Sequence, residues 1–244
     1  MAAADPQAHA DPVLQVLPGV QLQLLPERAL WWPQAGTLFI ADLHLGKAAT
    51  FRARGLPVPA GTTQDNLARL SAVLARTGAG RLVVLGDFLH AAEALTAAVR
   101  SALQAWRAAH AGLAVVLVRG NHDRHAGDPP GALALQVVDE PFAPEPGVPL
   151  ACCHHPQALP GQVVLAGHLH PAVLLRGPGR DALRLPAFCH EAGQVLLPSF
   201  GDFTGGHTLR AARGRRLYAV GGGRVWAVPT SSPSPSPAGG RGRG

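Results

Sequence analysis

The segment Leu117-Val118-Arg119-Gly120-Asn121-His122-Asp123 joins the end of a buried-strand pattern to polar side chains that bind metals or move protons. An apolar run from Leu113 to Val118 precedes the glycine, and a continuous β-branched run closed by a turn signal predicts a buried strand. The polar residues therefore follow the carboxyl end of a strand, where open α/β folds bind their ligands. We expect an oxygen ligand from Asn121, a proton donor in His122, and an aspartate, Asp123, that fixes the tautomer of that histidine.

Four further clusters of possible metal ligands follow short apolar runs elsewhere in the chain. They are Asp42-Leu43-His44, Gly86-Asp87, His154-His155-Pro156 and Gly167-His168-Leu169-His170. In an extended chain residues i and i+2 point the same way, so Asp42 and His44 can converge on one ion. Nitrogen and oxygen ligands without thiolate favour Mn²⁺, Fe or Zn²⁺ over Ca²⁺. The ligands are too many for one tetrahedral ion, so the sequence predicts two ions that share a bridging carboxylate, an arrangement suited to phosphoryl displacement.

The pattern of elements predicts an α/β fold with two packed sheets and helices outside. Strands alternate with helices in the first half, where we expect helices from Thr62 or Thr63 to Arg76 and from Ala92 to His110. The segment 46–60 is predicted as a loop, and 124–149, with six prolines, as a surface connection. The second half is rich in strands and ends in a hairpin at Gly221-Gly222-Gly223.

Length and composition indicate one domain, or at most two small ones, in a chain of 244 residues that is 47% hydrophobic. We expect a disordered N-terminus over 1–12, a domain over 13–228, and a disordered Ser/Pro-rich and Gly/Arg-rich tail over 229–244. No apolar stretch approaches the ~18 residues that span a bilayer. The N-terminus lacks the basic region of a signal peptide, and three cysteines are too few for a disulfide framework. These observations predict a cytoplasmic protein without a membrane segment.

The net charge of +6 is unevenly distributed, since seven of the 21 basic residues and none of the 15 acidic residues lie after Asp202. Such a C-terminal arm can attract a polyanion in a salt-dependent way, or it can be an ordinary solvated tail. Arg52 and Arg54 follow the Asp42 and His44 pair closely. They can bind a substrate phosphate or be ordinary surface charges.

The five clusters, in this order, resemble the signature of the calcineurin-like metallophosphoesterases over about residues 37–170. The segment Ala41–Lys47 with the pattern Arg52-x-x-Gly55-x-x-x-Pro59 resembles the bacterial ligase-associated phosphoesterases of the PdeM type. The segments Gly86–His90 and Pro198–Gly206 extend this likeness. The resemblance implies a metallophosphoesterase domain over 13–228 with a four-layer fold. In it, a two-sheet β-sandwich is flanked by helices and carries a dinuclear metal site at the carboxyl ends of strands.

The resemblance also implies a role for each site residue. Asp42, His44 and His170 would hold one divalent ion, Asn121, His154 and His168 would hold the other, and Asp87 would bridge the two. His122 would protonate the leaving alkoxide or stabilise the charged transition state, with Asp123 orienting it. Related sites with a His-x-Pro pattern ligate through the histidine two before the proline, which favours His154, with His155 as the alternative. His90 stands where many relatives carry a second aspartate, and we expect it beside the ligands or at the surface.

The resemblance implies a Mn²⁺-dependent phosphodiesterase, with endonuclease activity on single-stranded DNA, that works with a DNA ligase and a helicase in repair. Few aromatic residues are available to stack on bases, and Trp31, Trp32, Phe51 and Phe203 are the candidates. A phosphodiesterase or phosphatase acting on nucleotides or other small phosphoesters is one alternative. A non-catalytic repair protein is another, but a decayed site is expected to have lost a ligand and none is missing.

Overall fold

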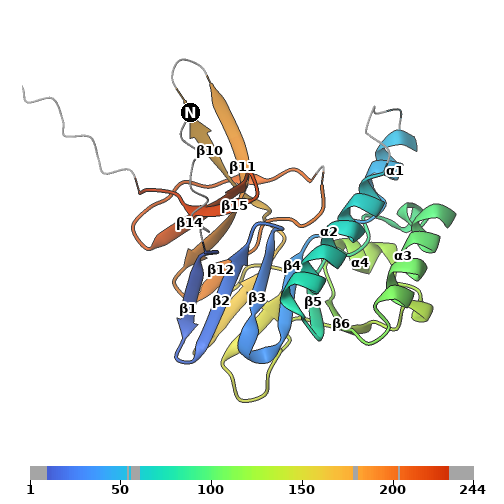
Figure 1. Ribbon diagram of the computed structural model, residues 1–244, viewed down its shortest axis with the longest axis horizontal. Helices are drawn as coiled ribbons and strands as arrows, with labels where there is room; N and C mark the ends of the chain where they lie inside the picture. Colours follow the sequence, from blue (N-terminus) through green and yellow to red (C-terminus); the bar gives the residue numbers. More distant parts are fainter. Residues whose placement is uncertain (1–9, 54, 56–60, 178–180, 203, 231–244) are drawn as a thin grey trace, which may run out of the picture.

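The computed structural model describes residues 10–53, 55, 61–177, 181–202 and 204–230, and its strands form two sheets (Figure 1). The first sheet has the order β1 (Val13–Leu17), β2 (Val20–Leu25), β3 (Ala29–Trp32), β4 (Thr37–Ala41), β5 (Arg81–Leu85), β6 (Ala114–Val118) and β7 (Gln136–Val138). Strands β1 to β4 form an antiparallel meander. Strands β4 to β7 are parallel, so their carboxyl ends meet at one edge of the sheet.

The second sheet contains the strands of the C-terminal half. They are β8 (Leu150–Cys153), β9 (Val163–Ala166), β10 (Pro171–Arg176), β11 (Ala182–Glu191), β12 (Gln194–Leu196), β13 (His207–Thr208), β14 (Arg215–Gly221) and β15 (Arg224–Ala227). The order is β13-β10-β11-β12-β9-β8, with β14 paired to β11 and β15. Parallel pairing of β8 with β9 brings the residues that follow both strands to one edge. Strands β10 and β11 form an antiparallel pair that extends beyond the rest of the sheet (Figure 1).

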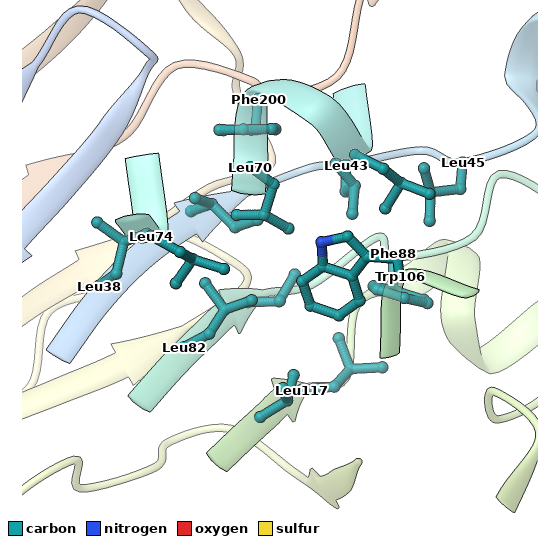
Figure 2. Close-up of a cluster of buried hydrophobic side chains, with 14 of the residues drawn as sticks. Leu38, Leu43, Leu45, Leu70, Leu74, Leu82, Phe88, Trp106, Leu117 and Phe200 are labelled. Carbon is teal, nitrogen blue, oxygen red and sulfur yellow. The ribbon is translucent and has the colours of Figure 1, made fainter. Parts of the chain in front are cut away.

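Two cores lie on the two faces of the first sheet. Helices α2 (Thr62–Thr77) and α3 (Ala97–Ala109) pack on the outer face, where Leu70 and Trp106 meet Leu38 and Leu82 (Figure 2). On the inner face, Phe39 packs against Phe188 of the second sheet. Neighbouring residues of β4 thus enter different cores, which explains why this parallel strand is apolar throughout.

The other helical segments are short and lie in the connections of the first sheet. They are α1 (Lys47–Ala53), α4 (Asn121–Ala126) and the 3₁₀ turns η1 (Pro33–Ala35), η2 (Ala92–Ala94) and η3 (Gly131–Leu133). None of the described helices has both the length and the apolar composition needed to span a bilayer.

The predicted α/β sandwich of two sheets is confirmed, and the helices α2 and α3 cover only the first sheet. In the described residues no helix lies beyond Leu133, and the outer face of the second sheet packs against loop residues such as Leu159 and Leu209. Two local predictions were wrong: α1 replaces part of the predicted 46–60 loop, and β7 lies within the predicted connection 124–149.

Both ends of the described chain form contacts with the rest of the domain. Asp11 pairs with Arg76 at 3.2 Å, and the carbonyl of Pro12 accepts a hydrogen bond from the Leu24 amide. The expected disorder of 1–9 and 231–244 falls outside the described residues. Much of the arginine-rich C-terminal arm belongs to the second sheet, because Arg215 and Arg216 lie in β14 and Arg215 pairs with Glu191. The arm is therefore not a uniformly free polycation.

Candidate metal centre and active site

The polar residues of all five sequence clusters meet between the two sheets, at the carboxyl ends of their strands. Asp42 and His44 follow β4, Asp87 follows β5, and Asn121 opens α4 after β6. From the second sheet, His154 follows β8, and His168 and His170 follow β9. Overlapping groups of the histidine and aspartate ligand atoms lie within 4.8 Å of one another. The structure thus brings these residues together, as the sequence predicted.

The first cluster contains Asp42, His44 and His170. His170 Nε2 lies 3.4 Å from Asp42 Oδ1 and 3.4 Å from His44 Nε2. His44 Nε2 is also 3.6 Å from Asp87 Oδ2. Asp42 and His44 are buried, while the side chain of His170 is partly exposed.

The second cluster contains Asn121, His154 and His168. His154 Nε2 lies 2.8 Å from Asn121 Oδ1 and 3.1 Å from His168 Nδ1. It is 3.5 Å from Asp87 Oδ1. Because Asp87 presents Oδ2 to the first cluster and Oδ1 to the second, its carboxylate is shared by both.

The donor set fits a pair of divalent cations. Imidazole nitrogens that face each other at 3.1–3.4 Å have one proton to share at most, and a cation between them satisfies both lone pairs. Burial lowers the pKa of His44 and of His168, with neighbouring cationic groups acting in the same direction. Both rings are therefore neutral near pH 7, which is the form that binds metal. Desolvation raises the pKa of Asp87, and a bound cation favours its charged form.

The backbone at these residues is unusual. Seven non-glycine residues in the described part of the chain have positive φ, and five of them belong to the two clusters: Asp42, His44, Asp87, His168 and His170. Such conformations cost about 1–3 kcal/mol each and persist where the surrounding structure enforces them. The amide of His44 donates to the Asp87 carbonyl at 2.8 Å, and the amide of His168 donates to Asp42 Oδ2 at 2.9 Å. The strands thus hold the ligands in a shape that the free chain disfavours.

Three glycines make room for this packing. Gly86 and Gly120 come directly before the candidate ligands Asp87 and Asn121, as Gly167 does before His168. A Cβ atom at Gly86 would overlap the imidazole of His154, and one at Gly120 would overlap Asp87. A Cβ at Gly167 would lie 2.6 Å from Asp42 Oδ2. The glycines in the sequence motifs therefore allow the close approach of candidate ligands from other strands.

His154 and His155 occupy different environments. His154 is fully buried within the second cluster. The side chain of His155 is 42% exposed, and its Nδ1 lies 2.7 Å from Glu140 Oε1. Glu140 Oε2 also accepts hydrogen bonds from the amides of both histidines. A nitrogen of His155 still lies near those of His154 and His168, but the contacts with Asn121 and Asp87 belong to His154.

His122 lies beside the first cluster, with its ring centroid 5.0 Å from that of His44. Its amide donates to Asp87 Oδ1 at 2.9 Å, and its Nδ1 lies 2.7 Å from the carbonyl oxygen of His90. Since a carbonyl can only accept, Nδ1 carries the proton, and Nε2 remains for a substrate. The ring of His90 stacks on that of His122 at 5.1 Å.

Asp123 has a different role from the one expected. Its Oδ1 accepts hydrogen bonds from the amides of Phe88 and Leu89, at 2.9 and 3.3 Å, and its Oδ2 accepts from the Gly120 amide at 3.0 Å. This buried carboxylate ties the loop after β5 to the start of α4. The orientation of His122 comes from the His90 carbonyl, so the expectation that Asp123 orients His122 is replaced.

The predicted phosphate-binding arginines receive no support from the described residues. Arg54 lies outside them, and Arg52 belongs to α1 without a described side chain. Sequence reasoning missed the part played by Ser199, whose hydroxyl donates to the Asp42 carbonyl at 2.8 Å, and by Gly201, whose amide donates to the same oxygen at 3.1 Å. The segment Pro198–Gly206 was part of the family resemblance, but no function had been predicted for it.

The chain belongs to the calcineurin-like phosphoesterase family, whose model matches residues 36–157. Among solved structures it is similar to the Pseudomonas putida nuclease MPE. The two chains are 44% identical, the match covers 89% of this chain and 100% of that one, and the TM-score is 0.77. The phosphoesterase Yfce from E. coli is 17% identical, with 80% and 99% covered and a TM-score of 0.41. No curated protein matches the chain. The protein is therefore a phosphoester hydrolase of a family that uses divalent metal ions.

Proposed function

We propose that this protein is a metal-dependent phosphodiesterase with endonuclease activity on single-stranded DNA. The observation that carries the proposal is the Asp87 carboxylate, which faces one ligand cluster with each oxygen while its neighbour His122 keeps Nε2 available. Similarity to a nuclease over the whole length of that relative supports a nucleic acid as the substrate, and the choice of single-stranded DNA comes from the family resemblance.

The residues divide the chemistry between them. Asp42, His44 and His170 would hold one divalent ion, Asn121, His154 and His168 the other, and Asp87 both. When bound, such a pair supplies a water of lowered pKa and stabilises charge on a phosphoryl group. In its doubly protonated form, with Nδ1–H still donating to the His90 carbonyl, His122 gives the Nε2 proton to the leaving alkoxide or stabilises the charged transition state. Lys47, half-buried near Asp42 and Asp87, adds a positive charge close to the site.

The finer parts of the proposal rest on the donor set and on the resemblance. Nitrogen and oxygen donors without thiolate are compatible with Mn²⁺, with Fe and Zn²⁺ as alternatives. The resemblance supports a role in DNA repair alongside a ligase and a helicase, to be tested by pull-down of each with the full chain. The three cysteines are buried and unpaired, which supports a reducing compartment such as the cytoplasm.

The decisive experiment offers circular single-stranded DNA to protein loaded with Mn²⁺. We expect nicking by the wild type and none by the double variant Asp87→Ala, His122→Ala. Because a circle has no ends, conversion to a linear form demonstrates an endonuclease. If the wild type nicks no more than the double variant but hydrolyses bis-p-nitrophenyl phosphate, the substrate is a small phosphodiester and the DNA proposal is wrong.

A further inference from the structure

A cavity of about 310 Å³ opens beside His170, at the edge of the first ligand cluster. Its charged lining residues are Arg28, Arg184 and Asp202, and its apolar lining includes Leu185 and Pro186 of β11. A volume near 300 Å³ is at the lower end of the range for small-molecule sites, which suits a ligand the size of one nucleotide. None of these residues has a role in the metal centre described above.

Arg184 brings a free positive charge to this cavity. It is exposed on β11, and its Nη2 lies 2.9 Å from the position that a Cβ atom would take at Gly206. The His170 carbonyl lies 2.7 Å from the same position. The guanidinium therefore lies over Gly206, close to the backbone of a candidate ligand. Among the described residues no carboxylate forms an ion pair with Arg184.

The negative charge that lines the cavity, on Asp202, is neutralised by two ion pairs. Its Oδ1 lies 3.0 Å from Arg28 Nη1, and its Oδ2 lies 3.3 Å from Arg69 Nη1. Two guanidinium groups thus share one carboxylate and leave an excess positive charge. Together with Arg184, this group gives the cavity a net attraction for an anion. Guanidinium groups favour phosphate because their planar donors match its oxygens.

A second cavity, of about 550 Å³, reaches the centre from the side of His122. It is lined by His90, Glu93, Asn121, His122 and His125. Space for a ligand therefore exists both beside the first cluster, at His170, and beside the proposed proton donor. A small diester needs only the centre itself, whereas a polymer of phosphodiesters is long enough to reach both cavities.

We propose that the cavity at Arg184 binds one nucleotide unit of a nucleic acid strand whose scissile phosphate lies at the metal centre. Arg184 and Arg28 contact the phosphate next to the scissile one, and Leu185 with Pro186 packs against its sugar or base. This inference rests on the proposed function and makes it specific for a strand with consecutive phosphates. Arg184 is then a residue that determines specificity for the polymer.

The test compares Arg184→Gln with Arg176→Gln. The register of the β10–β11 pair places Leu174 opposite Arg184 and Arg176 opposite Ala182, so both arginines lie on one face of the hairpin. Arg176 is exposed and does not line the cavity, and both variants remove one charge. Steady-state kcat and KM are measured for a single-stranded oligonucleotide and for bis-p-nitrophenyl phosphate, over a series of salt concentrations.

We expect Arg184→Gln to raise KM for the oligonucleotide by about tenfold, as for loss of a hydrogen bond to a charged group. Its effect on KM for bis-p-nitrophenyl phosphate should be less than about twofold, because that ester has no second phosphate. The slope of log(kcat/KM) against log[salt] should fall by about one. Arg176→Gln should behave as wild type.

Three results overturn the inference while leaving DNA cleavage established. They are an unchanged oligonucleotide KM for Arg184→Gln, an equal loss on both substrates, and an equal loss in Arg176→Gln. The last would mean that the diffuse charge of the hairpin matters and the cavity does not. Failure of the wild type to cut the oligonucleotide would instead contradict the proposed function itself.

Discussion

At the scale of single residues, a substitution at His122 can distinguish a role in proton transfer from a role in metal binding. His122→Ala removes the imidazole but keeps the amide that donates to Asp87. We expect kcat on DNA to fall about 10²- to 10⁴-fold, the usual contribution of general acid catalysis. The fall with bis-p-nitrophenyl phosphate should be much smaller, because p-nitrophenolate leaves without a proton. Equal losses on the two substrates, or a loss of bound metal, would contradict a proton donor.

The neighbouring histidines 154 and 155 offer a matched pair of variants. His154→Ala removes a buried ring that contacts Asn121 and Asp87, so we expect it to lose bound metal and at least about 100-fold in activity. His155→Ala breaks a contact with Glu140, and its metal content should stay close to that of the wild type. Metal analysis after dialysis measures both. If His155→Ala lost metal and His154→Ala retained it, His155 would be the ligand.

At the scale of elements, the turn after β5 depends on a glycine with two separate requirements. Gly86 has φ +79°, and a Cβ there would overlap His154. Gly78, at the end of α2, has φ +66° and open space around its Cβ position. Gly78→Ala should therefore cost only the left-handed backbone, about 1–2 kcal/mol in the free energy of unfolding.

We expect Gly86→Ala to cost more than Gly78→Ala and also to reduce metal binding, because His154 is displaced. Urea unfolding and metal titration measure the two effects separately. If both variants lose the same stability and both bind metal normally, the contact with His154 does not constrain this turn.

The elements that the sequence predicts well are those whose residue pattern is compatible with only one type of secondary structure. Strands β4 to β6 are continuous apolar runs, and α2, predicted from residue 62 or 63 to 76, buries Leu67, Leu70 and Leu74 at helical spacing. Each is followed by a glycine or by ligand residues that end it. The meeting of the ligands that follow β4, β5 and β6 was predictable from these strand ends, because neighbouring parallel strands bring their carboxyl ends to one edge of the sheet. The assignment of ligands from both sheets to two ions came from the family resemblance.

The elements that were missed have local sequences that favour something else. Strand β11 contains Pro186, which removes a backbone donor and weakens the strand pattern. The helix α2 begins at Thr62, one of the two predicted starts, but its N-cap is Gly61, which has no side chain to cap the helix. The carboxylate of Asp123 binds amides 34 and 35 residues away, at Leu89 and Phe88, and such a contact is set by tertiary packing. Local patterns do not contain this information.

At the scale of the whole molecule, metal, protons and stability are linked. Burial lowers the pKa of His44 and His168, so protons compete with metal at these rings only below the usual histidine range. Activity should fall below about pH 6, with the half-saturating metal concentration rising as the pH drops. The unfolded chain protonates these histidines first, so the metal-free protein should also lose stability as the pH falls below about 6.5. Titrating activity with metal at several pH values tests the competition between protons and metal. Loss of activity in acid that is independent of the metal concentration would contradict it.

The hydrogen bonds from Ser199 and Gly201 to Asp42 join residues separated by more than half of the chain. During translation, Asp42 leaves the ribosome long before these partners and before His168 and His170 are made. A stalled or truncated nascent chain therefore has an open coordination sphere and no fastened Asp42 backbone. We therefore expect phosphoester hydrolysis only from chains synthesised beyond Gly201.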